Sequence, residues 1–220
     1  MHKIRIAIIA TLFIAGTCCF FVTSCYPPIQ SEEAQEQRVE YIPPTFDYFD
    51  EAMKVVLLHE GGYSNDQFDK GGATKFGVSL AFLKSDHLDI DGDGDVDIDD
   101  VKALTLARSD EIYKQFFWIP NHYENIENKD LAIKIFDTCV NAGANRTHKI
   151  LKSSINAIIK GKIAVNGQMD EDTIDIINLI DHDMLLKEFR KEQANFYRAI
   201  VKKTPKYKKF LNGWLARSKE

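Results

Sequence analysis

An aspartate-rich stretch is the strongest constraint on how this 220-residue chain can fold. Residues 89–100 read DIDGDGDVDIDD and hold seven aspartates, which repel one another unless a cation offsets their charge. The spacing matches the twelve-residue calcium loop of EF-hands. Gly94 stands at position 6, where the tight turn needs glycine, and Val96 stands at position 8, where an apolar side chain points inward. The pattern therefore predicts a loop that binds calcium.

The expected ligands occupy alternate positions of this loop. They are Asp89, Asp91, Asp93, Asp95 (through its main-chain carbonyl), Asp97 and Asp100. Aspartate at position 12, in place of glutamate, resembles dockerin-type loops and leaves open whether the last ligand is bidentate. Because there is one loop and no methionine-rich groove, we expect a structural Ca²⁺ ion rather than a calcium sensor. A solvated acidic turn is the alternative.

The first 25 residues predict an export signal that is not part of the fold. Lys3 and Arg5 precede an almost wholly apolar stretch over residues 6–22, the order found in secretory signals. The stretch is followed by VTSC, in which Cys25 resembles the lipidated cysteine of a bacterial lipobox; a retained membrane anchor is the alternative. Residues 26–44 are polar and bracketed by prolines, which predicts a linker. We therefore expect a lipid-anchored protein of the bacterial cell envelope, at the outer membrane.

Composition restricts what holds the remaining chain together and what it binds. Beyond the leader only Cys139 remains, so no intrachain disulfide is expected and the core must stabilise the fold. The formal charge of −5 lacks the basic excess of a nucleic-acid-binding protein. Without the leader, which holds Lys3 and Arg5 and no acid, the formal charge is −7. The seven aspartates of the loop account for this charge, so the rest of the body is neutral by count and predicts no strong attraction to an anionic partner. We expect a monomer.

Apolar spacing predicts a mainly α fold with a small β element. Helices are expected over residues 46–60, 109–118 (starting at Ser109 or Asp110), 129–142, 146–160, 171–180 and 183–203. Thr45 can cap the first helix, and Gly61 and Gly143 can end the first and the third. Residues 61–80 are rich in glycine, asparagine and aspartate and predict a loop or short hairpin.

Glu60 ends the first predicted helix on its apolar stripe. It shares this stripe with Val56 and Leu57, whereas His59 lies off it. Burial raises the pKa of a carboxyl group, and a carboxyl that stays protonated can act as a general acid. The alternative is a helix-end glutamate whose charged group lies in water.

The residues after Glu60 could complete a site. Gly61 and Gly62 would leave space beside the acid, and Asp66 and Asp69 could supply a second carboxylate. Two further residues could contact a sugar, and these are Tyr63 and Thr74.

Five motifs together resemble glycoside hydrolase family 108. They are HEGGYSND, DKGGATKFGVS, IYKQFFW after the aspartate loop, IFDTCVNAG and FLNGWLARS, which lie in order over residues 46–217. Members of this family are peptidoglycan N-acetylmuramidases of bacteria and phages with a lysozyme-like fold, and some are described as secretion activators. The resemblance implies that Glu60, in the EGGY motif, is the catalytic acid.

The resemblance also implies the organisation of the chain. We expect a lysozyme-like catalytic domain over residues 45–145, containing the calcium loop, and a helical region over residues 146–220 similar to the family's peptidoglycan-binding region. In the latter, Asp170 stands where the usual signature has a second glycine, so packing against the catalytic part is an equal alternative. Asp137 and Asn141 lie one helical turn apart and are either substrate-binding residues or a packing pair.

The sequence thus predicts a peptidoglycan hydrolase that cleaves the β-1,4 bond between N-acetylmuramic acid and N-acetylglucosamine. Whether Asp66, Asp69 or neither assists Glu60 stays open, and so does the choice between inversion and retention. A lytic transglycosylase and a non-catalytic wall-binding lipoprotein are the competing hypotheses.

Overall fold

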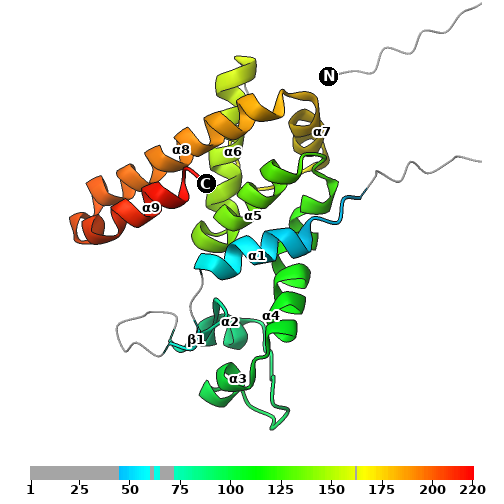
Figure 1. Ribbon diagram of the computed structural model, residues 1–220, viewed down its shortest axis with the longest axis vertical. Helices are drawn as coiled ribbons and strands as arrows, with labels where there is room; N and C mark the ends of the chain where they lie inside the picture. Colours follow the sequence, from blue (N-terminus) through cyan, green and yellow to red (C-terminus); the bar gives the residue numbers. More distant parts are fainter. Residues whose placement is uncertain (1–44, 60–61, 65–71, 162) are drawn as a thin grey trace, which may run out of the picture. The chain divides into compact units, whose positions relative to one another are not determined.

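The computed structural model describes residues 45–59, 62–64, 72–161 and 163–220 (Figure 1). All of them fall in one compact unit, Ile42–Glu220. This unit is mainly α, as predicted. Its helices are α1 (Phe49–His59), α2 (Leu80–Ser85), α3 (Ile98–Ala103), α4 (Leu106–Tyr113), α5 (Lys129–Ala142), α6 (Ala144–Ile159), α7 (Glu171–Leu179), α8 (His182–Lys203) and α9 (Leu211–Arg217). None of the described helices combines the length and the apolar character needed to span a membrane.

Helix bounds agree with the predictions best in the second half of the chain. The structure gives α5 its predicted bounds, and the predicted bounds of α6, α7 and α8 differ by one or two residues. The first helix begins at Phe49, so Thr45 does not cap it. The predicted start at residue 109 is also wrong, because Thr105 accepts a hydrogen bond from the Arg108 amide and starts α4 earlier. Helix α4 then widens into a π-helical turn, Lys114–Trp118.

The predicted β element is a hairpin of two strands, each two residues long. Strands β1 (Thr74–Lys75) and β2 (Val78–Ser79) pair antiparallel. The turn between them is Phe76 and Gly77, both with positive φ (51° and 79°), as a type I′ turn requires. Ser79 then caps α2, a helix that the sequence pattern did not predict, by accepting a hydrogen bond from the Phe82 amide.

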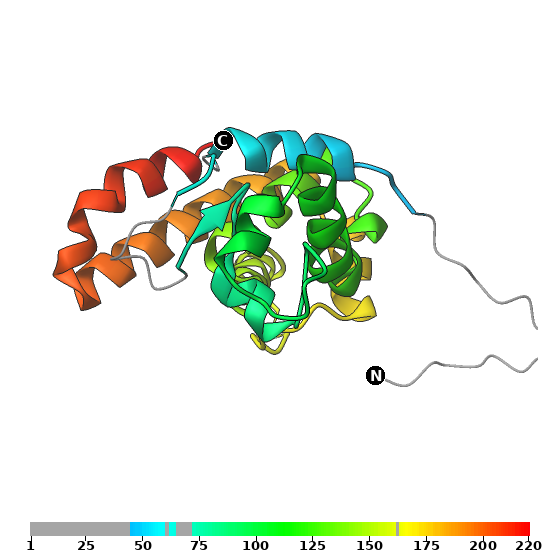
Figure 2. The same ribbon diagram turned by 90° about the horizontal axis from the view of Figure 1, so that it is seen from below.

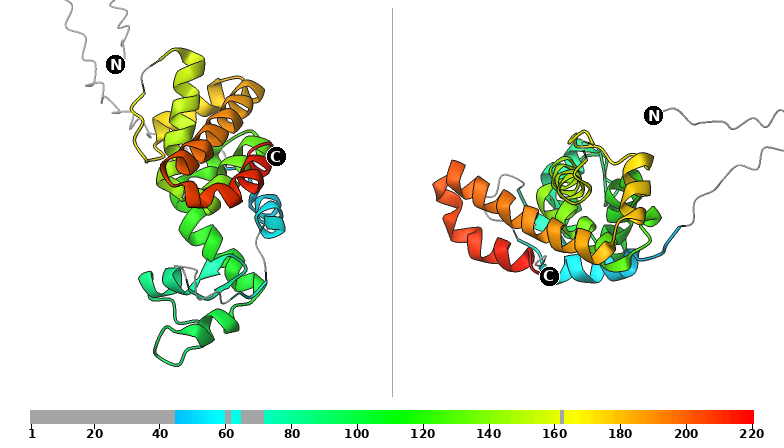
Figure 3. Two further views of the ribbon diagram at one scale, coloured as in Figure 1. Left: turned by 90° about the vertical axis from the view of Figure 1, so that its left-hand side faces the viewer. Right: turned by 90° about the horizontal axis from the view of Figure 1, so that it is seen from above.

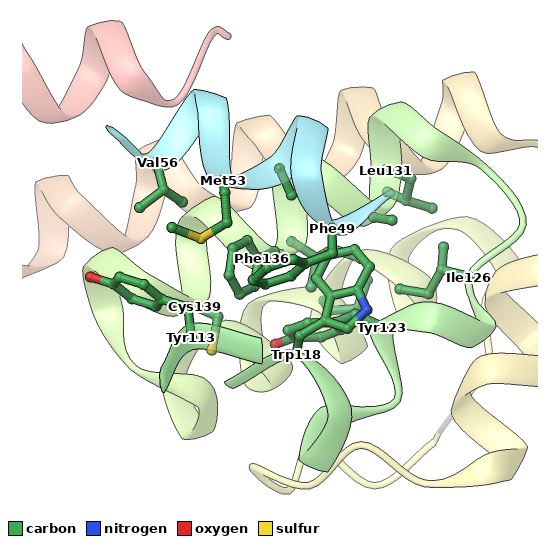
Figure 4. Close-up of a cluster of buried hydrophobic side chains, with 14 of the residues drawn as sticks. Phe49, Met53, Val56, Tyr113, Trp118, Tyr123, Ile126, Leu131, Phe136 and Cys139 are labelled. Carbon is green, nitrogen blue, oxygen red and sulfur yellow. The ribbon is translucent and has the colours of Figure 1, made fainter. Parts of the chain in front are cut away.

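Helices α1 and α5 pack against each other, and α1 is the cyan helix of Figure 2. The core between them is an aromatic cluster (Figure 4). Phe136 of α5 lies edge-on to Trp118, with ring centroids 5.2 Å apart, and to Phe49 of α1 at 6.0 Å. Tyr123 completes the cluster and is fully buried. Edge-to-face pairs add about 0.5–1.5 kcal/mol each to the free energy gained by burial. This packing fixes α1, the helix that ends just before Glu60.

The C-terminal helices pack on the same core. Helix α8 packs against α6 and α5, then reverses through the 3-10 segment Pro205–Phe210 into α9 (Figure 3). Helices α8 and α9 lie side by side as an antiparallel pair. The predicted boundary near residue 145 falls at the start of α6, which packs against α5. The predicted domain limits stay predictions.

Candidate functional site

The residues predicted to carry the chemistry lie in a part of the chain outside the described residues. These are Glu60, Gly61, Asp66 and Asp69, and the predicted lipidation site Cys25 lies outside them as well. The described residues on both sides of Glu60 therefore define the frame of the site.

Helix α1 brings the chain to this frame. Its buried face consists of Phe49, Ala52, Met53 and Val56, and Val56 is fully buried. The last residue, His59, points away from that face, and its Nε2 lies 2.8 Å from Glu220 Oε2. The end of α1 is therefore held by core packing on one side and by the contact of His59 with Glu220 on the other.

A pair of backbone hydrogen bonds anchors the chain shortly after Glu60. The Ser64 amide donates to the Thr74 carbonyl at 2.8 Å, and the Thr74 amide donates to the Ser64 carbonyl at 2.8 Å. Ser64 thus extends the hairpin from the β1 side. The positions of Asp66 and Asp69 fall within the segment that this pair closes.

The two residues predicted to contact a sugar, Tyr63 and Thr74, differ in how free their side chains are to contact a ligand. Tyr63 is 46% exposed. The Thr74 hydroxyl donates its hydrogen to the Gly72 carbonyl at 3.3 Å, so its oxygen is left to accept a hydrogen bond.

Asp137 and Asn141 face the C-terminal helices. Asp137 is buried, and its carboxylate accepts hydrogen bonds from the Arg217 guanidinium, the shortest at 2.7 Å. Asn141 accepts from the Tyr197 hydroxyl at 2.7 Å. Structural pairing therefore accounts for both side chains, and a substrate-binding role for either stays a prediction.

The aspartate loop begins with a turn held by its own first residue. Asp89 Oδ1 accepts from the Gly92 amide at 2.6 Å, and Oδ2 accepts from the Gly94 amide at 2.9 Å. Gly94 has φ of +100°, a conformation that favours glycine, as its position in the motif requires. Val96 packs against the core, in the inward orientation that the sequence predicts.

The loop is closed by Asp100, which is buried. Its Oδ1 accepts from the Ile90 amide and its Oδ2 from the Asp97 amide, both at 2.6 Å. Burial alone raises the pKa of Asp100, but hydrogen bonds from Asp97, Ile90 and Asp91 outweigh it, and the net pKa is lowered. Asp100 therefore stays ionised and ties the start of the loop to its end.

The loop gathers carboxylate oxygens into two groups. Asp89, Asp91 and Asp93 form the first, and Asp95, Asp97 and Asp100 form the second; within each group the ligand atoms lie within 4.8 Å of one another. Desolvation and repulsion by Asp93 raise the pKa of Asp91, and repulsion by Asp93 raises the pKa of Asp95. The donors are hard oxygens, which suit Ca²⁺.

Sequence reasoning missed a set of buried polar residues behind this frame. Lys134 donates to the Arg217 carbonyl, and burial lowers the pKa of Lys134 to about 8. His148 and Lys152 hold the segment before α7, where Lys152 Nζ lies 2.9 Å from Asp170 Oδ2. Their signal was visible, because Lys134, His148 and Lys152 lie among isoleucine and leucine residues on the buried faces of α5 and α6.

Comparisons with known proteins give the chain two family matches. Residues 53–143 match glycosyl hydrolase 108, and residues 149–219 match the predicted peptidoglycan domain. The structure is similar to that of Brucella abortus SagA, with a TM-score of 0.62 and 24% identity, over 78% of this chain and 89% of that chain. This likeness shows a shared fold. No curated protein matches.

Proposed function

Because this chain belongs to the glycosyl hydrolase 108 family, we propose that it is an N-acetylmuramidase acting on peptidoglycan. The family supports a glycoside hydrolase, and the peptidoglycan domain supports the cell wall as its partner and the cell envelope as its location. The bond proposed is the β-1,4 linkage from N-acetylmuramic acid to N-acetylglucosamine.

Glu60 is the proposed general acid. Its proton passes to the glycosidic oxygen as the bond from that oxygen to C1 breaks, and positive charge develops on the ring. Water then adds to C1 and loses a proton to a base. If Asp66 or Asp69 is that base, at about 6.5–9.5 Å from Glu60, the configuration inverts; a nucleophilic carboxylate at about 5 Å would retain it.

The observation that carries this proposal is the Ser64–Thr74 backbone pair. It joins the residues shortly after α1 to the β-hairpin, and the stretch of sequence between Ser64 and Thr74 contains Asp66 and Asp69. In this proposal Glu60, the residue after α1, and one of these two aspartates act on opposite sides of one sugar. Exposed Tyr63, between Glu60 and this pair, is available to contact the glycan.

Mass spectrometry of digested muropeptides tests the proposal. We expect soluble fragments with reducing N-acetylmuramic acid ends. Anhydro-muramic ends would instead identify a lytic transglycosylase, in which a hydroxyl of the substrate attacks C1. No release of fragments, with intact binding to sacculi, would identify a non-catalytic wall-binding protein.

The aspartate loop is the proposed structural calcium site. Asp89, Asp91 and Asp93 would supply side-chain oxygens, Asp95 its carbonyl, and Asp97 and Asp100 the remaining ligands. Support comes from the register of the motif and the grouping of its carboxylates. The ion would offset repulsion in the loop, whose last residues form the first turn of α3. Because Asp100 already accepts backbone hydrogen bonds on both oxygens, we expect it to be the weakest ligand.

The proposed location follows from the N-terminal sequence. A lipid on Cys25 would hold a monomeric enzyme at the membrane, with the outer membrane as the expected one. Metabolic labelling with a fatty acid, compared with Cys25→Ser, tests this part separately.

A further inference from the structure

The helical pair α8–α9 carries an unbalanced positive charge. Residues 193–219 contain eight lysines and arginines and no aspartate or glutamate, although the whole chain has a formal charge of −5. The count that makes the body neutral outside the aspartate loop averages this basic C-terminal segment with an acidic remainder.

Five lysines gather where α8 turns into α9. We call residues 202–210 the hairpin tip; its lysines are Lys202, Lys203, Lys206, Lys208 and Lys209, and all five are exposed. In the part of the chain that the structure describes, none of them forms an ion pair with a carboxylate. The aspartate loop lies at the far end of the unit from α8 and α9 (Figures 1 and 3), so it does not neutralise them.

Aromatic side chains are interleaved with these lysines. Phe210 is 44% exposed, and Lys209 Nζ lies 4.7 Å from its ring centroid. Lys206 Nζ lies 5.3 Å from the Tyr207 ring centroid. Phe210 stacks on Trp214, with centroids 5.8 Å apart, so the exposed ring is held on a packed base. An apolar ring surrounded by lysines is the composition of surfaces that lie at the membrane–water interface.

We propose that the hairpin tip binds the surface of an anionic phospholipid membrane, with Phe210 entering the headgroup region. The lysines favour this partner over wall carboxylates. Lysine is a hydrated point charge suited to a diffuse anionic surface, whereas planar carboxylates are recognised best by arginine, and the tip has none. A cavity between α8 and α9, whose lining includes Arg190 and Leu215, contains no residue of the tip.

This contact gives the molecule an orientation that a lipid on Cys25 alone would not give. The tip would meet headgroups while the aspartate loop faces away from the anionic surface. The proposal does not depend on catalysis, because it uses neither Glu60 nor the segment that Ser64 and Thr74 close.

Vesicle sedimentation tests the proposal with a chain that begins at residue 42 and holds the whole compact unit without the predicted leader. We expect binding to vesicles of phosphatidylglycerol and phosphatidylcholine, release in 0.5 M NaCl, and no binding to phosphatidylcholine alone. The variant Lys203→Gln, Lys206→Gln, Lys209→Gln should lose on the order of 100-fold in partitioning, since each lysine near an anionic surface contributes about fivefold.

The matched control changes the same charge elsewhere. Lys54→Gln, Lys84→Gln, Lys149→Gln alters three other exposed lysines and should bind within about twofold of wild type. Phe210→Ala should weaken vesicle binding, whereas Leu179→Ala, at another exposed apolar residue, should not. Equal losses in both lysine variants, or equal binding to both vesicle types, would overturn the proposal. A third result would also overturn it: the wild type does not bind vesicles, and the tip variant loses binding to purified sacculi. The tip would then be a contact with the cell wall.

Discussion

Arg217 Nε lies 3.1 Å from each carboxylate oxygen of Asp137, and its Nη2 lies 2.7 Å from Oδ1. The two residues are 80 positions apart, one in α9 and the other in the middle of α5, and both are buried. A buried ion pair that loses one partner leaves an uncompensated charge. This pair therefore ties α9 to the core.

Removing this guanidinium should destabilise the whole unit. We expect Arg217→Ala to lower the free energy of unfolding by about 3–5 kcal/mol, measured by urea denaturation, because Asp137 would stay buried without its partner. Arg198→Ala removes an exposed arginine from the neighbouring helix and should change stability by less than about 0.5 kcal/mol. Equal losses in the two variants would show that the ion pair is not what secures α9.

Calcium should raise the melting temperature. At a Ca²⁺ concentration about 100 times the dissociation constant, the stabilisation is about 2.7 kcal/mol, or roughly 5–10 °C for a unit of this size. Calorimetry with Ca²⁺ and with a chelator measures the shift. Asp91→Asn together with Asp93→Asn should abolish it.

The control for the calcium test lies in the same stretch. Asp99 is the aspartate of residues 89–100 that is not an expected ligand, and its carboxylate pairs with Lys102 at 2.6 Å. Asp99→Asn should keep the full calcium shift. A melting temperature unmoved by Ca²⁺ in the wild type would leave the loop as a solvated acidic turn.

Acid should weaken the fold through His148. Burial lowers the pKa of His148, and the hydrogen bond with the Gly167 carbonyl opposes this only in part. Its Nε2 lies 2.9 Å from the Tyr123 hydroxyl, and its Nδ1 lies 3.0 Å from the Gly167 carbonyl, an arrangement that neutral imidazole satisfies. The unfolded chain then binds a proton more readily than the folded chain. The contribution of neutral His148 to stability is fully present above about pH 6.5. It is lost as the pH falls below this value towards the lower pKa of His148 in the folded state.

Urea denaturation between pH 5 and pH 8 measures this dependence. His148→Asn keeps a donor for the Gly167 carbonyl but cannot titrate, so its stability should change less with pH even though it is lower throughout. Identical pH slopes in wild type and variant would assign the acid sensitivity to other groups.

Loss of the acid at position 60 should remove hydrolysis while leaving the fold intact. We expect Glu60→Gln to lower muropeptide release by at least about 100-fold, because a glutamine cannot donate the proton, with a melting temperature close to that of wild type. Asp66→Asn and Asp69→Asn are assayed in parallel. The second catalytic carboxylate is the one whose substitution lowers muropeptide release about as much as Glu60→Gln does. Unchanged release by Glu60→Gln would exclude the proposed mechanism.

Local patterns predicted the second half of the fold well. Helix α5 has its predicted bounds because Asn128 caps its start and Gly143 ends its apolar period, and both signals lie within the helix or beside it. Helix α2 was missed because it is six residues long and shows no clear period. The start of α4 was misplaced because Thr105, not Ser109, is the cap.

The spacing of residues along the chain could not predict which side chains distant in sequence contact each other. The four-residue spacing of Asp137 and Asn141 predicts that the two side chains share a helix face. It does not predict that Arg217 contacts Asp137 or that Tyr197 contacts Asn141. Lysine within the apolar face of α5 signals a buried polar contact, yet its partner, the Arg217 carbonyl, is 83 residues away. The charge of the hairpin tip, in contrast, was present in the sequence and was hidden only by averaging over the whole chain.

The Ser64–Thr74 pair joins the two ends of the stretch of sequence that contains Asp66 and Asp69. Its two hydrogen bonds hold Ser64 beside β1. Doubling the length of a flexible loop costs only about 0.6 kcal/mol in closure entropy. A longer segment that keeps Asp66 and Asp69 should therefore cost the protein little stability.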